Sequence, residues 1–147
     1  TVAASVPKEK RVTAASPSES PGSLSKMRIL IADDSPDNRY LLKRILTRRG
    51  ASVHEVENGA EAVEQEHAYD LVLMDIQMPV MDGYRAIEQL RSDHYEGKII
   101  ALTAHALQEE KDRVTAIGCN DYLTKPIDTV ALLASIRRNM MPLHTQI

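Results

Sequence analysis

The chain has 147 residues, 43% of them hydrophobic, which is enough for one compact domain and too few for two. Its 18 basic and 21 acidic residues leave a formal net charge of -3, so the composition gives no reason to expect a surface for nucleic acid or an anionic membrane. The single cysteine, Cys119, cannot form an intramolecular disulfide, and no apolar run approaches the roughly 20 residues of a membrane span. We therefore expect a cytoplasmic segment that contacts neither nucleic acid nor membrane.

The first 25 residues differ in composition from the rest. They are rich in Ala, Ser, Thr and Pro and hold too few large apolar residues to form a core, so we expect 1–25 to be a disordered linker. The chain begins with Thr1 and has no signal-peptide pattern, and we interpret it as a piece of a longer protein. We expect the folded domain over 26–141 and a short C-terminal tail over 142–147.

Beyond the linker, short apolar runs alternate with longer segments of helical period. This alternation is typical of repeated βα units that form a parallel sheet covered on both faces. The expected strands are 27–32, 52–56, 70–74, 98–103 and 121–125. The expected helices are 36–49, 59–68, 82–92, 107–118 and 128–140. Pro36 at the start of the first helix and Gly50 after it are start and stop signals, and Asp82 and Asp128 begin the third and fifth helices.

Polar side chains stand at the carboxyl ends of four of these strands. Asp33 and Asp34 follow the first strand, and Asp75 follows the third. The fourth strand ends at Thr103 and the fifth at Lys125, whereas the second ends in nothing comparable. Because functional side chains of open parallel sheets lie at the carboxyl ends of the strands, we expect these residues to converge on one site.

Each of these residues has an ordinary structural explanation when it is taken alone. An Asp-Asp pair is often a solvated turn or a helix cap, Thr103 suits a strand, and a lone Lys125 would be a solvated charge. Asp75 is more informative, since a carboxylate on a buried strand is costly unless something pairs with it. A cis bond between Lys125 and Pro126 would aim the ammonium back across the sheet. Taken together, the residues favour a site.

Two stretches, MDIQMPVMDG (74–83) and GCNDYLTKPI (118–127), resemble the receiver domains of two-component response regulators, most of all those of hybrid sensor histidine kinases. The resemblance spans about 27–139 and includes the acidic pair, the phosphoacceptor position Asp75, the hydroxyl Thr103 and the lysine Lys125. It implies an α/β, flavodoxin-like doubly wound (βα)5 fold with a five-stranded parallel sheet in the order 2-1-3-4-5. Tyr122 matches the switch aromatic of the family.

The resemblance also implies a magnesium ion as cofactor. Asp34 would bind it directly and Asp33 through water, and Asp75 and the backbone carbonyl of Gln77 would complete the protein ligands. A metal is chemically reasonable here, because a carboxylate attacks a phosphoryl group only when their negative charges are screened.

The remaining signature residues would handle the phosphoryl group that Asp75 accepts from a phosphohistidine. Lys125 would neutralise one phosphoryl oxygen, and Thr103 would donate its hydroxyl to another. Inward movement of Thr103 would vacate space for Tyr122, which converts a local charge event into a change of surface shape. Catalysis would be limited to phosphorylation and dephosphorylation of the domain itself.

The phosphodonor must be a separate kinase or phosphotransfer domain. His54 lies in a strand-like run, and the sequence has no glycine-rich ATP lid. We expect partner binding at the first helix, with Pro36, Arg39 and Tyr40 exposed, and at Ile127 after the Lys-Pro pair. The isolated domain is expected to be a monomer.

Two alternatives come from other functional classes. A haloacid-dehalogenase-type phosphatase also uses a strand-end aspartate and magnesium, but it needs a second acid where this chain has Gln77. An interaction module that cannot be phosphorylated usually lacks one of the polar residues, and this chain keeps them all. No segment long enough for a DNA-binding output domain follows the last helix, which favours the receiver of a hybrid kinase or a stand-alone receiver.

Overall fold

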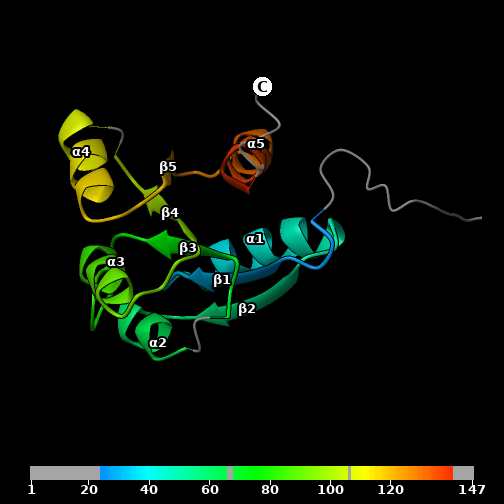
Figure 1. Cartoon of the computed structure of the whole chain (residues 1–147). Coiled ribbons are helices and arrows are strands. Elements are labelled where there is room, and N and C mark those ends of the chain that lie inside the picture. Colours follow the sequence, from blue (N-terminus) through cyan, green and yellow to red (C-terminus); the bar gives the residue numbers. More distant parts are fainter. Residues whose placement is uncertain (1–23, 66–67, 106, 141–147) are drawn as a thin grey trace, which may run out of the picture.

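The computed structural model describes residues 24–65, 68–105 and 107–140, and strands alternate with helices along them. The strands are β1 (Arg28–Ala32), β2 (Ser52–Val56), β3 (Leu71–Asp75), β4 (Lys98–Thr103) and β5 (Asp121–Thr124). The helices are α1 (Pro36–Arg48), α2 (Gly59–Glu64), α3 (Gly83–Ser92), α4 (Gln108–Ala116) and α5 (Thr129–Met140). The strands form one parallel sheet in the order β2-β1-β3-β4-β5 (Figure 1). The predicted fold class and strand order are confirmed.

The helices cover both faces of the sheet, and a separate apolar core fills each side. One core packs the sheet against α2, α3 and α4, and the other packs it against α1 and α5. Successive residues of β1 divide between them: Leu30 belongs to the first core, and Ile29 and Ile31 belong to the second. This division follows from the period of two in a strand. β3 lies in the middle of the sheet and is buried at all of its positions, as its unbroken apolar run predicts.

The ends of the elements depart from the predicted ranges by a few residues. α4 ends at Ala116, before Gly118, whose φ of 112° is the left-handed conformation that closes many helices. α5 begins at Thr129, and Asp128 precedes it and accepts a hydrogen bond from the backbone N–H of Ala131 at 2.9 Å. α2 ends at Glu64, although the predicted helix runs to residue 68, and residues 66 and 67 lie outside the described ranges.

The described chain begins inside the expected linker. Leu24 is buried and packs into the α1 and α5 core, and its backbone N–H donates to the carbonyl of Arg49 at 2.7 Å. The rest of the expected linker and the tail at 142–147 lie outside the described residues, so both remain predictions. Across the described ranges, no helix has both the length and the apolar character needed to cross a bilayer.

Candidate functional site

Three carboxylates meet at the carboxyl ends of β1 and β3. Asp33 and Asp34 follow β1 directly, and Asp75 is the last residue of β3. One carboxylate oxygen from each lies within 4.8 Å of the others. Asp33 and Asp75 are buried, with 0% and 2% of their surface exposed, whereas Asp34 is exposed. The predicted convergence of the acidic pair on Asp75 is therefore observed.

The first turn of α1 fixes the carboxylate of Asp33. The backbone N–H of Ser35 donates to Asp33 Oδ1 at 2.8 Å, and the side chain of Asn38 approaches Oδ2 at 3.5 Å. Ser35 also caps α1, because its hydroxyl oxygen accepts from the N–H of Asn38 at 3.3 Å. A helix N-terminus therefore holds this acid, and its dipole favours the negative charge.

Lys125 brings a positive charge between the two buried acids. Its Nζ lies 3.1 Å from Asp75 Oδ2 and 3.3 Å from Asp33 Oδ2. The bond between Lys125 and Pro126 is cis. Burial lowers the pKa of Lys125. Its hydrogen bond to Asp75 and the charges of both acids raise the pKa by more than burial lowers it, so the pKa lies above its ordinary value. The ammonium stays charged at neutral pH.

The surroundings of Asp75 disfavour the charged form of its carboxylate. Burial, followed by the charge of Asp33, raises its pKa from 3.8 to about 6, and Lys125 offsets part of that increase. The backbone N–H of Gln77 donates to Asp75 Oδ1 at 3.1 Å. Three crowded carboxylates with one lysine leave excess negative charge, and carboxylate oxygens are the donors that a hard divalent cation such as Mg²⁺ prefers. The donor set therefore fits the expected metal.

Gly83 allows α3 to begin directly against the loop that follows β3. Its backbone N–H donates to the carbonyl of Ile76 at 2.8 Å. A Cβ at this position would lie 2.3 Å from the carbonyl oxygen of Asp75, closer than side-chain carbons approach. Any larger residue would therefore displace the backbone that carries the acid.

Thr103 lies at the end of β4 with 3% of its surface exposed. Its hydroxyl donates to Oε1 of Glu110 in the first turn of α4 at 2.7 Å, and it lies 3.2 Å from the carbonyl oxygen of His105. The hydroxyl of Tyr84 in α3 donates to Oε2 of the same glutamate. Sequence reasoning missed Glu110 and Tyr84, because an acid in the first turn of a helix and an aromatic residue on an apolar face both have ordinary explanations.

A cavity of about 540 Å³ opens beside the acidic cluster. Its lining includes Asp34, Gln77, Tyr84, His105, Glu110 and Arg113. The guanidinium carbon of Arg113 lies 3.5 Å from the ring centroid of Tyr84, which places a positive charge over that aromatic face. The cavity is thus bounded by the loops after β1, β3 and β4, as expected for the mouth of such a sheet.

Tyr122, the expected switch residue, lies in β5 and pairs in register with Ala101, two residues before Thr103. It is partly buried and packs against the core under α2, α3 and α4, and Lys111 Nζ lies 5.1 Å from its ring centroid. A narrow void is lined by Thr103, Val114 and Tyr122 together with their neighbours. The two residues predicted to be coupled therefore line the same void, while their coupled movement stays a prediction.

The expected partner-binding residues are only partly where the sequence placed them. Pro36 and Tyr40 are exposed, and Ile127 is partly buried against the α1 and α5 core. The prediction that Arg39 is exposed is wrong: 13% of its side chain is accessible. Its guanidinium bonds to Glu55 on β2 at 3.2 Å and to the carbonyl of Asp33 at 2.6 Å, because this side of α1 faces the neighbouring strand.

Comparisons with known proteins agree with this geometry. Residues 29–137 match the response regulator receiver domain model. The chain is 48% identical over 107 residues to the sensor protein GacS of Pseudomonas syringae pv. syringae, covering 68% of this chain and 12% of that protein. It is 40% identical over 113 residues to protein PilH of Pseudomonas aeruginosa, covering 74% of this chain and 93% of PilH.

Solved receiver structures share the fold. One is the receiver domain of the sensor histidine kinase PA1611 from Pseudomonas aeruginosa, with a magnesium ion coordinated in its active site cleft. The two structures have a TM-score of 0.70 and 36% sequence identity, and the match covers 77% of this chain and 96% of that one. Another is the Saccharomyces cerevisiae complex of the phosphotransfer protein Ypd1 with the Ssk1 receiver domain, with a TM-score of 0.72 and 33% identity, covering 78% and 89%. The chain belongs to the response regulator receiver domain family.

Proposed function

We propose that the chain is a phospho-accepting module, in which Asp75 takes a phosphoryl group from a phosphohistidine with the help of Mg²⁺. The supporting observation is the buried carboxylate of Asp75, which faces the ammonium of Lys125 at 3.1 Å and lies beside two further acids. In the transfer, a P–O bond forms to a carboxylate oxygen as the P–N bond breaks, and the imidazole keeps the electron pair and takes up a proton.

Each neighbouring residue has a separate part in this proposal. Asp34, Asp75 and the carbonyl of Gln77 would hold Mg²⁺ directly and Asp33 would hold it through water, and the ion would screen the negative charges that meet during the transfer. Lys125, already paired with Asp75, neutralises a phosphoryl oxygen. Thr103 turns its hydroxyl toward another phosphoryl oxygen, and Tyr122 follows it inward, so that the surface formed by β4, α4 and β5 changes shape.

The proposed partner is a histidine kinase or a histidine phosphotransfer domain. The Ssk1 receiver domain, which is 33% identical to this chain, was crystallised with the histidine phosphotransfer protein Ypd1. Pro36 and Tyr40 on α1, with Ile127 across the mouth, form the proposed contact surface, and Tyr40 has 64% of its surface exposed. An exposed aromatic residue on the helix that follows the acidic pair suits an interface.

The proposed context is the receiver module of a hybrid sensor histidine kinase. The GacS relatives and BarA of Escherichia coli, described as a signal transduction histidine-protein kinase, have aligned segments that cover 12% of each protein. In that context the module is cytoplasmic, acts as a monomer, and contacts neither nucleic acid nor membrane. The kinase activity would belong to the parent protein.

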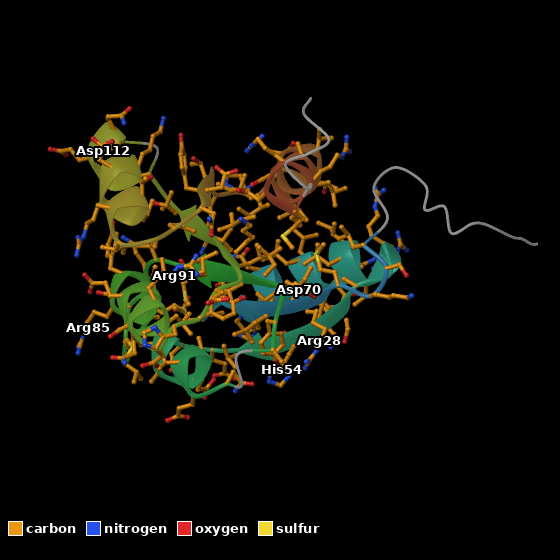
Figure 2. The ribbon with its side chains drawn as sticks, in the orientation of Figure 1. Arg28, His54, Asp70, Arg85, Arg91 and Asp112 are labelled. Carbon is orange, nitrogen blue, oxygen red and sulfur yellow. The ribbon has the colours of Figure 1, made fainter. Side chains whose placement is uncertain are left out.

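Incubation with acetyl phosphate and Mg²⁺ tests the phosphoacceptor. Intact-mass measurement should show one added phosphate on the wild type and none on Asp75→Asn, because the amide is not a nucleophile toward phosphorus. Asp112→Asn is the matched control: this exposed acid on α4, labelled in Figure 2, should be dispensable. Wild-type phosphate incorporation by Asp75→Asn would overturn the proposal.

A magnesium titration followed by NMR tests the ligand set. Asp34→Ala removes an exposed carboxylate from the cluster without touching either core, so it should lose magnesium affinity and still unfold cooperatively. Identical titration curves for the variant and the wild type would remove Asp34 from the ligands.

A further inference from the structure

Thr103 enters the proposed mechanism through its hydroxyl, and this hydroxyl is bonded to a side chain outside the acidic cluster. Its hydroxyl donates to Glu110 Oε1 at 2.7 Å, whereas Lys125 already faces Asp75. A hydroxyl has one proton and can donate it to one strong acceptor at a time. The bond to Glu110 and a bond to a phosphoryl group on Asp75 therefore exclude each other.

Glu110 is itself held firmly in this position. The hydroxyl of Tyr84 donates to its second oxygen, Oε2, and the guanidinium of Arg113 lies over the Tyr84 ring. The hydrogen bond from Tyr84, followed by that from Thr103, lowers the pKa of Glu110, so its carboxylate is charged at neutral pH. Burial, followed by the bond to Glu110, raises the pKa of Tyr84 to about 12, so the phenol keeps its proton and remains a donor.

The contacts join three elements around the cavity. Thr103 ends β4, Glu110 lies in the first turn of α4, and Tyr84 lies in the first turn of α3. Tyr84 and Glu110 both line the cavity beside the acidic cluster. The glutamate is thus a fixed, charged acceptor at the edge of the site in which the phosphoryl group would be bound.

We infer that Glu110 is a positioning residue. From α4 it holds the hydroxyl of Thr103, and it competes with a phosphoryl group on Asp75 for the single proton of that hydroxyl. This inference rests on the proposed function and adds a regulatory element to it. Phosphorylation must break the bond between Thr103 and Glu110, which frees the first turn of α4 from the end of β4. The strength of that bond sets how strongly the phosphorylated conformation is favoured.

Removing the competitor should strengthen binding of a phosphoryl mimic. Hydrogen bonds to charged groups are among the stronger ones in proteins, so the expected gain in affinity is about tenfold. The probe is beryllium fluoride with Mg²⁺, a mimic used on the DrrB receiver domain, to which this chain is 25% identical. Its dissociation constant would be measured by NMR titration for the wild type, Glu110→Ala and Glu110→Gln.

Two further variants separate competition from general effects. Glu109→Ala removes an exposed acid from the same turn and reports how much of any gain comes from the loss of negative charge. Thr103→Val removes the hydroxyl while nearly keeping the side-chain volume. In the Thr103→Val background, Glu110→Ala should change the affinity no more than Glu109→Ala does, because no proton remains to compete for.

The possible outcomes are distinct. A gain in both Glu110 variants that exceeds the gain in Glu109→Ala and disappears with Thr103→Val supports the inference. Unchanged or weaker binding in both Glu110 variants overturns it, and so does a gain that persists in Thr103→Val. If wild-type protein shows no saturable binding that depends on Asp75, the proposed function fails and the inference fails with it.

Discussion

α3 and α4 lie side by side on one face of the sheet and are attached to it very differently (Figure 1). α3 buries Gly83, Tyr84, Ala86, Ile87 and Leu90. Among the residues that the structure describes, α4 buries Val114 alone. The strands beneath follow the same trend, since β3 is buried throughout and every position of β5 is at least partly accessible. The acids that would do the chemistry therefore belong to the tightly packed region, and the partner of Thr103 belongs to the loosely packed one.

Polar contacts replace apolar packing on the looser side. Arg91 at the end of α3 donates to the carbonyl of Gly118 at 2.9 Å and to the side chain of Asn120 at 2.9 Å (Figure 2). It also donates to the carbonyls of Tyr95 and Gly97 at 2.7 and 2.8 Å. These bonds tie the loop after α4 to α3 at the amino end of the sheet, while the opposite end of α4 contacts the site. An element with few apolar contacts is suited to change position at low energetic cost.

Core truncation is the largest expected effect and tests the difference in packing directly. Ile87→Ala in α3 should lower the free energy of unfolding by about 4 kcal/mol. Val114→Ala in α4 should lower it by about 2 kcal/mol, because the valine loses fewer buried carbons and α4 can move to fill the gap. Urea denaturation at 25 °C measures both values. Glu88→Ala, at an exposed position of α3, should stay within about 0.5 kcal/mol of the wild type. Equal losses for Ile87→Ala and Val114→Ala would mean that α4 is anchored at least as well as α3, because the valine substitution removes one carbon fewer.

Asp121 tests the polar attachment of β5 to α5 and should have a smaller effect. Its carboxylate accepts hydrogen bonds from Ser135 Oγ at 2.6 Å and Asn139 Nδ2 at 3.1 Å, and it pairs with Arg138. Asp121→Asn removes the charge and should cost about 2 kcal/mol in the free energy of unfolding at pH 7. Urea denaturation of this variant measures the loss.

The pH dependence of that loss follows from the pKa of Asp121. Burial raises the pKa, but the hydrogen bonds from Ser135 and Arg138 lower it more, so the folded-state pKa lies below the ordinary value of 3.8. The stabilisation is therefore complete above the unfolded-state pKa and is lost as the pH falls through the folded-state pKa. The difference between wild type and Asp121→Asn should shrink below about pH 4. A difference that is constant from pH 7 to pH 3 would mean that the charge contributes nothing.

The sequence predicted most of the site for one physical reason. In a parallel sheet the carboxyl ends of the strands share an edge, so identifying the strands places Asp33, Asp75, Thr103 and Lys125 together without further information. The family resemblance supplied the order of the strands. The positions of the strands follow from regular periodicity, which local sequence carries well.

The contacts that the sequence did not predict depend on the distance between elements. Arg39 looked like an exposed helix residue, and only the packing of α1 beside β2 brings Glu55 within its reach. Glu110 looked like an ordinary acid in the first turn of a helix, and only the approach of α4 to β4 directs it to Thr103. Gly83 likewise shows its importance only when α3 is seen to begin against the backbone of Asp75. Side-chain partners across elements follow from tertiary packing, which a local sequence pattern does not predict.

The smallest expected effect concerns the rim of the cavity, where each region contributes one residue. Gln77 follows β3 on the tightly packed side, His105 follows β4 on the looser side, and both line the cavity. We expect these exposed side chains to shield the phosphoryl group on Asp75, because a long amide and an imidazole together fill more of the path of an attacking water than small residues would. The double variant Gln77→Ala/His105→Ala should therefore lose its phosphoryl group severalfold faster, equivalent to about 1 kcal/mol in the barrier.

Loss of phosphate would be followed at fixed Mg²⁺ in wild type, both single variants and the double variant. Arg85→Ala, at an exposed position of α3 (Figure 2), is the control. An unchanged rate would remove both residues from the mechanism, and a slower rate would mean that they position the water. If only His105→Ala accelerates the loss, the shield belongs to the β4 and α4 side, and movement of α4 would then also set how long the signal lasts.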